Sequence, residues 1–139
     1  MARKSKAKAI VLDTWSVMAF LEDEPASERV EAIITEAHEA GIPLLMTVVN
    51  VAEVWYIFAR DSSAEEADQG VSELKQLGIE FVEADWELSL EAAKFKAQHK
   101  MSLADCYAAA LAKSSQGDLI TGDHEFKQVE DEIKIDWMR

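Results

Sequence analysis

Four acidic residues occupy positions in this sequence where predicted strands end or predicted helices begin. Asp13 and Asp123 each end a short apolar run, whereas Glu53 and Asp105 each lie near the start of a helical pattern. Four carboxylates brought together repel one another unless a positive charge lies between them. Because such oxygen ligands suit hard divalent cations, the set predicts a metal site and a metal-dependent hydrolase.

The elements that would carry these acids alternate between strand and helix along the chain. Strands are predicted at 9–13, 43–49, 79–82, 118–121 and 133–136. Helices are predicted at 15–21, 26–40, 63–77, 86–99 and 103–115, with a further helix capped by Asn50 and a turn at 124–129. Alternation at this spacing indicates a three-layer α/β/α sandwich with a mostly parallel sheet of about five strands.

This architecture predicts that the four acids share one edge of the sheet. A helix in a right-handed strand–helix–strand unit runs antiparallel to its strands, so the start of helix 103–115 lies level with the end of strand 118–121. Ligands of open α/β sheets collect at this carboxyl edge. The neighbouring residues Thr14, Ser16 and Thr121 are expected to orient the carboxylates from a second layer.

Each acid also has a simpler interpretation as a helix cap. Asn50-x-x-Glu53 and Ser102-x-x-Asp105 have the spacing of capping boxes, and Asp13 and Asp123 can cap the turns that they open. Capping does not require the four positions to share an edge, so the joint pattern favours the metal site.

Composition limits the classes of protein that fit. The 139 residues, 49% of them hydrophobic, are expected to form one domain, 1–139, with residues 1–8 as a basic, flexible tail. No apolar run reaches the length of a membrane span, and no secretory leader is recognisable, so a cytoplasmic location is expected. The lone cysteine, Cys106, excludes an intramolecular disulfide and is expected to be a core residue.

The net charge of −13 is a poor match for a polyanionic substrate. Nucleic acid would therefore be attracted by local basic groups, although solvated helix faces are the simpler interpretation of each of them: Arg3, Lys4, Lys6, Lys8, Lys94, Lys96, Lys100, Lys113 and Lys127. The acidity equally suits a basic protein partner or a high-salt habitat.

Four segments resemble the motifs of the PIN-domain ribonucleases in order and spacing, over nearly the whole chain. They are VLDTWSVMAFL at 11–21, NVAEV at 50–54, SLADCYAAA at 102–110 and LITGDHEF at 119–126. The form most similar is the VapC-type toxin of prokaryotic toxin–antitoxin pairs. One departure is Trp15, which stands where the common pattern has a small polar residue.

This resemblance implies a magnesium- or manganese-dependent endoribonuclease. Asp13, Glu53, Asp105 and Asp123 would be its catalytic residues and metal ligands, with Glu53 acting through water or on a second ion. The expected products carry 5′-phosphate and 3′-hydroxyl ends. The resemblance also implies a homodimer and a small basic antitoxin partner.

The histidines do not support metal-free cleavage, which needs a paired acid and base. His38 and His99 are expected to be solvated, whereas His124 beside Asp123 is a candidate for contacting a phosphate of the substrate, as is Lys100.

Three other functions share some of these features. A phosphoacceptor receiver domain needs an acidic pair after its first strand, and Asp13 has no acidic neighbour. A catalytically inactive PIN-like binding protein and an RNA-processing nuclease without an antitoxin both remain open. The sequence does not identify which RNA would be cut.

Overall fold

The computed structural model describes residues 7–138, so most of the predicted basic tail, including Arg3, Lys4 and Lys6, lies outside the described residues. The elements follow in the order β1 (Ile10–Leu12), α1 (Thr14–Leu21), α2 (Ser27–Ala40), β2 (Leu44–Thr47), α3 (Val48–Asp61), α4 (Ala64–Gln76), β3 (Ile79–Val82), α5 (Trp86–Gln98), α6 (Leu103–Ser115), β4 (Asp118–Thr121), the 3₁₀ helix η1 (His124–Val129) and β5 (Lys134–Trp137).

The five strands form one sheet in the order β3-β2-β1-β4-β5. All four pairings are parallel, which makes the sheet more regular than the mostly parallel sheet expected from the sequence. The chain moves from β1 outward to β2 and β3, then returns across the sheet to β4 on the other side of β1. The neighbours β1 and β4 therefore mark the point where the direction of winding reverses.

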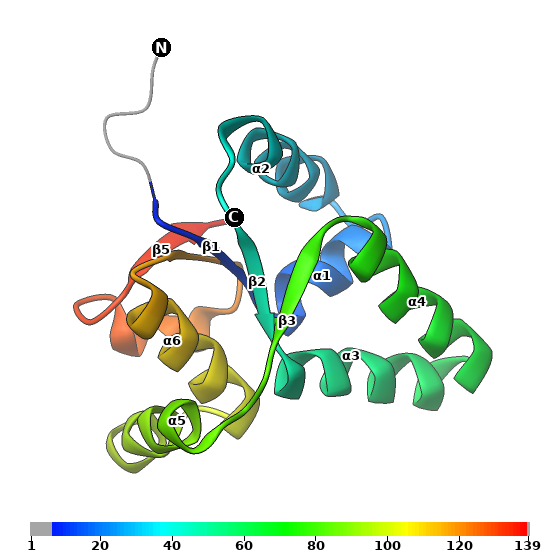
Figure 1. Ribbon diagram of the computed structural model, residues 1–139. Coiled ribbons are helices and arrows are strands. Elements are labelled where there is room, and N and C mark those ends of the chain that lie inside the picture. The colour runs from blue at the N-terminus through cyan, green and yellow to red at the C-terminus, as the bar shows by residue number, and fades with distance from the viewer. Residues whose placement is uncertain (1–6, 139) are drawn as a thin grey trace.

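Successive strand residues point to opposite faces of the sheet, and each face has its own core. Ile10 and Leu12 pack with α1 and α2, while Val11 between them packs with α5 and α6. Figure 1 shows these helices on the two sides of the strands. Cys106 of α6 is fully buried, as its predicted core role requires.

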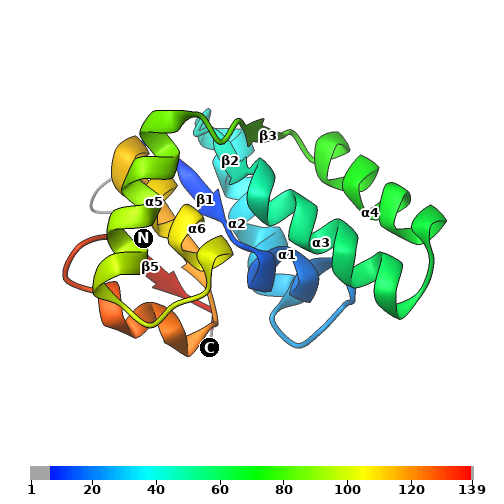
Figure 2. The same cartoon turned by 90° about the horizontal axis from the view of Figure 1, so that it is seen from below.

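Helices α3 and α4 pack against each other and project to one side of the sheet (Figure 2). Gly70 of α4 lies against the Phe58 ring of α3, because a Cβ atom there would be 3.4 Å from that ring. A hydrogen bond from Trp55 Nε1 to Asp68 Oδ1, 2.9 Å long, also joins the two helices. The outer surface of α3 keeps Tyr56 exposed.

The predicted start of α3 is wrong. The sequence placed a strand at 43–49 and a cap at Asn50, but β2 ends at Thr47, whose side chain caps a helix that begins at Val48. A hydroxyl acceptor at Thr47 satisfies the Asn50 N–H, so the β-branched pair Val48-Val49 enters the helix. Glu53 consequently lies in the second turn of α3, and the proposed Asn50-x-x-Glu53 capping box does not form.

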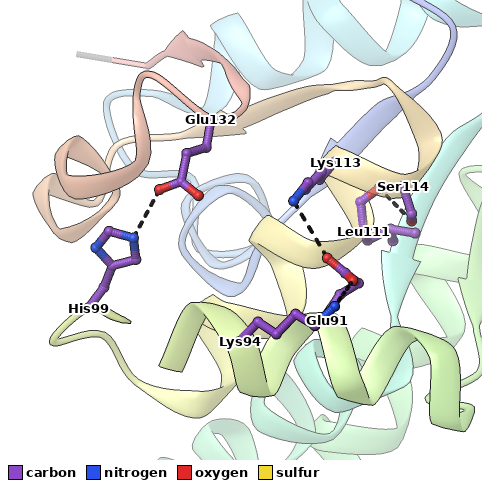
Figure 3. Close-up of polar contacts among 7 residues, drawn as sticks. All are labelled: Glu91, Lys94, His99, Leu111, Lys113, Ser114 and Glu132. Atoms are coloured by element: carbon purple, nitrogen blue, oxygen red, sulfur yellow. Dashed lines mark hydrogen bonds and ion pairs between the residues drawn. The ribbon is translucent and has the colours of Figure 1, made fainter. Parts of the chain in front are cut away.

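The outer surface of α5 and α6 carries the ion pairs drawn in Figure 3. Glu91 lies between Lys94, at 3.1 Å, and Lys113, at 3.6 Å. His99, expected to be solvated, instead has only 18% of its side chain exposed and contacts Glu132 Oε2 at 2.9 Å. The prediction missed this contact because the two residues come from separate elements.

Candidate metal centre

The reversal of winding at β1 and β4 brings Asp13 next to Thr121. Leu12 is in register with Ile120, so the next residues along, Asp13 and Thr121, lie level with one another. The Thr121 hydroxyl donates to Asp13 Oδ2 at 2.5 Å, across a sequence separation of 108 residues. Thr121 Oγ1 also accepts the N–H of Asp123 at 3.0 Å, which positions the second acid beside the first.

Asp13 combines a capping role with a place in the site. Its Oδ1 accepts the N–H of Ser16 at 2.8 Å, and Ser16 Oγ accepts the N–H of Asp13 at 3.1 Å, which completes a capping box. The residue is only 1% exposed. Burial raises the pKa of Asp13 to about 6, despite the hydrogen bonds from Thr121 and Ser16 that favour its ionised form.

Three carboxylates converge at this edge. Asp105 of α6, Asp123 after β4 and Glu125 of η1 each offer an oxygen within 4.8 Å of the others. Ser102 Oγ accepts the N–H of Asp105 at 3.1 Å, which fixes the start of α6. Burial, and then the negative charges of Asp123 and Asp13, raise the pKa of Asp105 to about 8. The crowded and buried position therefore favours the protonated, neutral form of the Asp105 carboxyl.

Glu53 is held near the cluster but does not belong to its tightest group. Its Oε1 accepts the Thr14 hydroxyl at 2.7 Å. Thr14 Oγ1 in turn accepts from the side-chain amide of Asn50, which is completely buried and also donates to the carbonyl of Ala104 in α6. Asn50 thus ties α1, α3 and α6 together around the site, a role that the sequence did not reveal.

A hollow of about 550 Å³ lies over these groups. Its lining residues are Thr14, Trp15, Met18, Glu24, Glu53, Ile57, Ser102, Asp105, Asp123 and Glu125. No lysine, arginine or histidine among the described residues lines it. The hollow therefore gathers carboxyl groups with no basic side chain of the described residues in its lining.

Comparison with known families identifies the chain. The sequence model of the PIN domain family matches residues 10–132. This chain belongs to the PIN domain family. Comparison with curated protein sequences returns no match.

Solved structures of toxin–antitoxin proteins share the PIN fold of this chain. VapBC2 of Rickettsia felis, bound to a DNA fragment of its promoter, has a TM-score of 0.76 at 12% identity and covers 93% of this chain and 98% of its own. DNA-bound VapBC of Salmonella typhimurium has a TM-score of 0.73 at 14% sequence identity, and the match covers 94% of this chain and 98% of that one. VapC20 of Mycobacterium tuberculosis, a toxin that cleaves the sarcin–ricin loop, has a TM-score of 0.68 at 12% sequence identity. The match covers 87% of this chain and 95% of that one.

The donor set at this edge fits a hard divalent cation. It consists of carboxylate oxygens, the ligands that Mg²⁺ and Mn²⁺ accept, and no sulfur or imidazole belongs to the group. Of the four predicted acids, Asp105 and Asp123 lie in the tight group, Asp13 lies behind it, and Glu53 lines the same hollow.

Glu125 is the residue that sequence reasoning missed. It follows Asp123 by two positions, and η1 turns its side chain back to the cluster. The available signal is the pair of acids in GDHEF, of which only Asp123 was predicted to belong to the site, together with the intervening His124. In the structure His124 is exposed and stacks on Trp137, with ring centroids 6.4 Å apart. Neither His124 nor Lys100 lines the hollow.

Among residues 7–138, no helix combines the length and the apolar character needed to cross a membrane.

Proposed function

We propose that this PIN domain is a metal-dependent endoribonuclease that hydrolyses RNA phosphodiesters. The observation that carries the proposal is the carboxylate group of Asp105, Asp123 and Glu125, placed in the β1–β4 crevice with no described cation beside it. Asp13, close enough to raise the pKa of Asp105, adds a further negative charge behind the group. Such crowding is unfavourable unless a divalent ion binds there.

One group of residues would bind the ion, and a second group would orient the side chains that bind it. Asp105, Asp123 and Glu125 would bind Mg²⁺ or Mn²⁺ directly, with Asp13 and Glu53 as additional ligands, directly or through water. A bound ion of this kind supplies a water of lowered pKa and positive charge next to the departing oxygen. Thr121 and Ser16 fix the Asp13 carboxylate, and Thr14 fixes Glu53. Asp105 would lose its proton on binding.

The biological role proposed for this nuclease is that of a toxin in a type II toxin–antitoxin pair. The support is the PIN fold shared with VapBC proteins of known structure, together with the sequence motifs. The proposal includes a homodimer acting in the cytoplasm and a small antitoxin whose basic side chains would neutralise the acidic hollow. An RNA-processing nuclease without an antitoxin would use the same site and is separated from the toxin by its effect on growth.

The enzymatic proposal is tested by RNA cleavage with and without metal. Wild-type protein is expected to cut single-stranded RNA with Mg²⁺ or Mn²⁺ and to lose cleavage with excess chelator. Asp105→Asn is expected to abolish cleavage while keeping the fold by circular dichroism. Glu91→Gln is the matched control, because it removes a carboxylate from α6's neighbour α5, outside the hollow. Cleavage that persists in Asp105→Asn with chelator would refute the metal mechanism. Wild-type protein that is well folded but does not cleave RNA would instead favour a catalytically inactive PIN-like binding protein.

The toxin role is tested by induced expression in a bacterial host. Wild-type protein is expected to arrest growth, and Asp105→Asn to relieve the arrest at equal expression. Normal growth with abundant, folded and active wild-type protein would contradict the toxin role without affecting the nuclease assignment.

A further inference from the structure

A second hollow adjoins the acidic one. It has a volume of about 340 Å³ and is lined by Trp15, Glu24, Pro25, Ala26 and Met138. Two of these residues, Trp15 and Glu24, also line the acidic hollow, so the two spaces meet at them. Its volume falls at the lower end of the range for small-ligand pockets. Its lining differs from that of the first hollow, since it is aromatic and apolar except for a single carboxylate.

Trp15 is placed against the chain segment that leads into the metal cluster. A Cβ atom added to the buried Gly122 would clash with the Trp15 ring, so the indole lies directly over the Gly122 backbone. The next residue is Asp123. On its own helix, Trp15 follows Thr14, whose hydroxyl contacts Glu53. The Trp15 ring therefore lies next to both the segment that carries Asp123 and the helix whose Thr14 contacts Glu53. The PIN-domain motif that residues 11–21 resemble usually has a small polar residue at this position.

Glu24 reaches the same place through a tight turn after α1. Asp23 adopts a left-handed backbone conformation with φ of 53°, which reverses the chain. The N–H of Glu24 then donates to the carbonyl of Ala19 at 2.9 Å, and its carbonyl accepts the N–H of Ser27 at 2.8 Å. The backbone of Glu24 is thus fixed at both polar groups, while its side chain is exposed at the rim of the two hollows.

We infer that the second hollow is a nucleobase subsite for the nucleotide next to the scissile phosphate, and that it favours guanine. This inference rests on the proposed ribonuclease function of the neighbouring site. Unpaired bases of single-stranded RNA bind by stacking on aromatic side chains and by hydrogen bonds from their Watson–Crick edge. Trp15 supplies the stacking surface, and Pro25, Ala26 and Met138 supply the apolar wall.

Glu24 supplies the base preference. A carboxylate only accepts hydrogen bonds, and its two oxygens match a pair of adjacent donors. Guanine presents such a pair, the ring N1–H and the exocyclic N2 amino group, whereas uracil presents one N–H between two carbonyl oxygens that a carboxylate repels. A guanine edge held by Glu24 would place the adjoining phosphate over the carboxylates of the acidic hollow.

The subsite is tested with short single-stranded oligonucleotides that contain one guanosine in a uridine tract. With Mn²⁺, cleavage is expected beside the guanosine, and replacement by inosine, which lacks the 2-amino group, is expected to raise KM about tenfold. Trp15→Ala is expected to raise KM about tenfold through lost stacking, while Trp15→Phe keeps most of it. Glu24→Gln, a change of an exposed side chain, is expected to lower the preference for guanosine over inosine, measured as the ratio of their kcat/KM values.

Binding separates this inference from the nuclease itself. Anisotropy of a labelled oligonucleotide on Asp105→Asn protein measures base preference without cleavage. Guanosine-dependent binding that Glu24→Gln abolishes would support the subsite even if the protein cut no RNA. Cleavage or binding that is equal at guanosine, inosine and uridine, or unaffected by Trp15→Ala, would overturn the subsite and leave the nuclease assignment standing.

Discussion

Acidic side chains in two regions of this molecule differ in their partners and in the direction of their pKa shifts. On the outer surface of α5 and α6, Glu91 contacts Lys94 and Lys113 (Figure 3), and the hydrogen bond from Lys94 lowers the pKa of Glu91. At the β1–β4 crevice, burial and neighbouring carboxylates raise the pKa of Asp105 to about 8, and no described lysine or arginine lines the hollow. Lysines of the chain pair with Glu91, whereas no lysine or arginine of the described residues lines the hollow beside Asp105.

The largest expected difference between the regions is in metal binding. Asp105→Asn is expected to weaken Mn²⁺ binding by more than about 100-fold, since losing even a residue that orients a metal ligand typically costs 10–100-fold. Isothermal titration calorimetry measures the affinity directly. Glu91→Gln, the matched change on the outer surface, is expected to leave it unaltered. Equal losses in both variants would show that general charge, rather than the crevice, attracts the ion.

Metal affinity is expected to depend on pH only through the crevice. Folded-state pKa values of about 8 for Asp105 and about 6 for Asp13 mean that both carboxyls hold protons in the metal-free protein as pH falls. Mn²⁺ must displace these protons, so affinity should fall by about tenfold per pH unit between roughly pH 8 and pH 6, where Asp105 alone is protonated. The fall should steepen below about pH 6, where Asp13 also holds a proton. Proton release measured in buffers of different ionisation enthalpy checks the mechanism. A flat affinity profile over this range would contradict it.

The burial and the repulsion that raise the pKa of Asp105 should also affect the stability of the metal-free protein. Because the pKa of Asp105 is raised from 3.8 to about 8 by folding, its contribution to stability is present at low pH and is lost as pH rises through about 8. Asp105→Asn should therefore raise the metal-free Tm above that of wild type, increasingly from pH 5 to pH 8, by roughly 3–5 °C per kcal/mol of relieved repulsion. Saturating Mn²⁺ should reverse the order. A variant less stable than wild type at pH 8 would argue against stored repulsion.

The smallest effect is expected on the outer surface. Glu91→Gln removes an exposed carboxylate from its lysines, and exposed ion pairs contribute little to stability. Its Tm is expected to match wild type at low and high salt. A marked loss of stability would show that the α5–α6 ion pairs hold the fold.

Much of the architecture was predictable because it depends on local patterns. Strands β3 and β4 and helix α6 have the bounds expected from alternating apolar and polar runs, and Ser102 caps α6 as its type and position indicate. Asp13 and Asp123 each follow a strand of a parallel sheet, so winding rules place both at its carboxyl edge. That β1 and β4 are neighbours is known only from the structure.

What the sequence did not reveal depends on side chains that meet across elements. Glu125 approaches Asp105 only because η1 folds back on the start of α6, and His99 contacts Glu132 across a similar gap. Asn50 looked like a cap from its residue type, yet Thr47 took that role and left Asn50 to bind Thr14 and Ala104. Residue type indicates which residues can cap a helix, but it does not decide between two nearby candidates such as Thr47 and Asn50.

The contact between Thr121 and Asp13 joins parts of the chain that are 108 residues apart. During synthesis the central strand β1 therefore lacks one of its two neighbours until most of the polypeptide has left the ribosome, because β1 pairs with β4 as well as with β2. Nascent chains shorter than this have no β1–β4 crevice in which the carboxylates can gather. Any activity of the carboxylate cluster therefore appears only after nearly the whole chain has been synthesised.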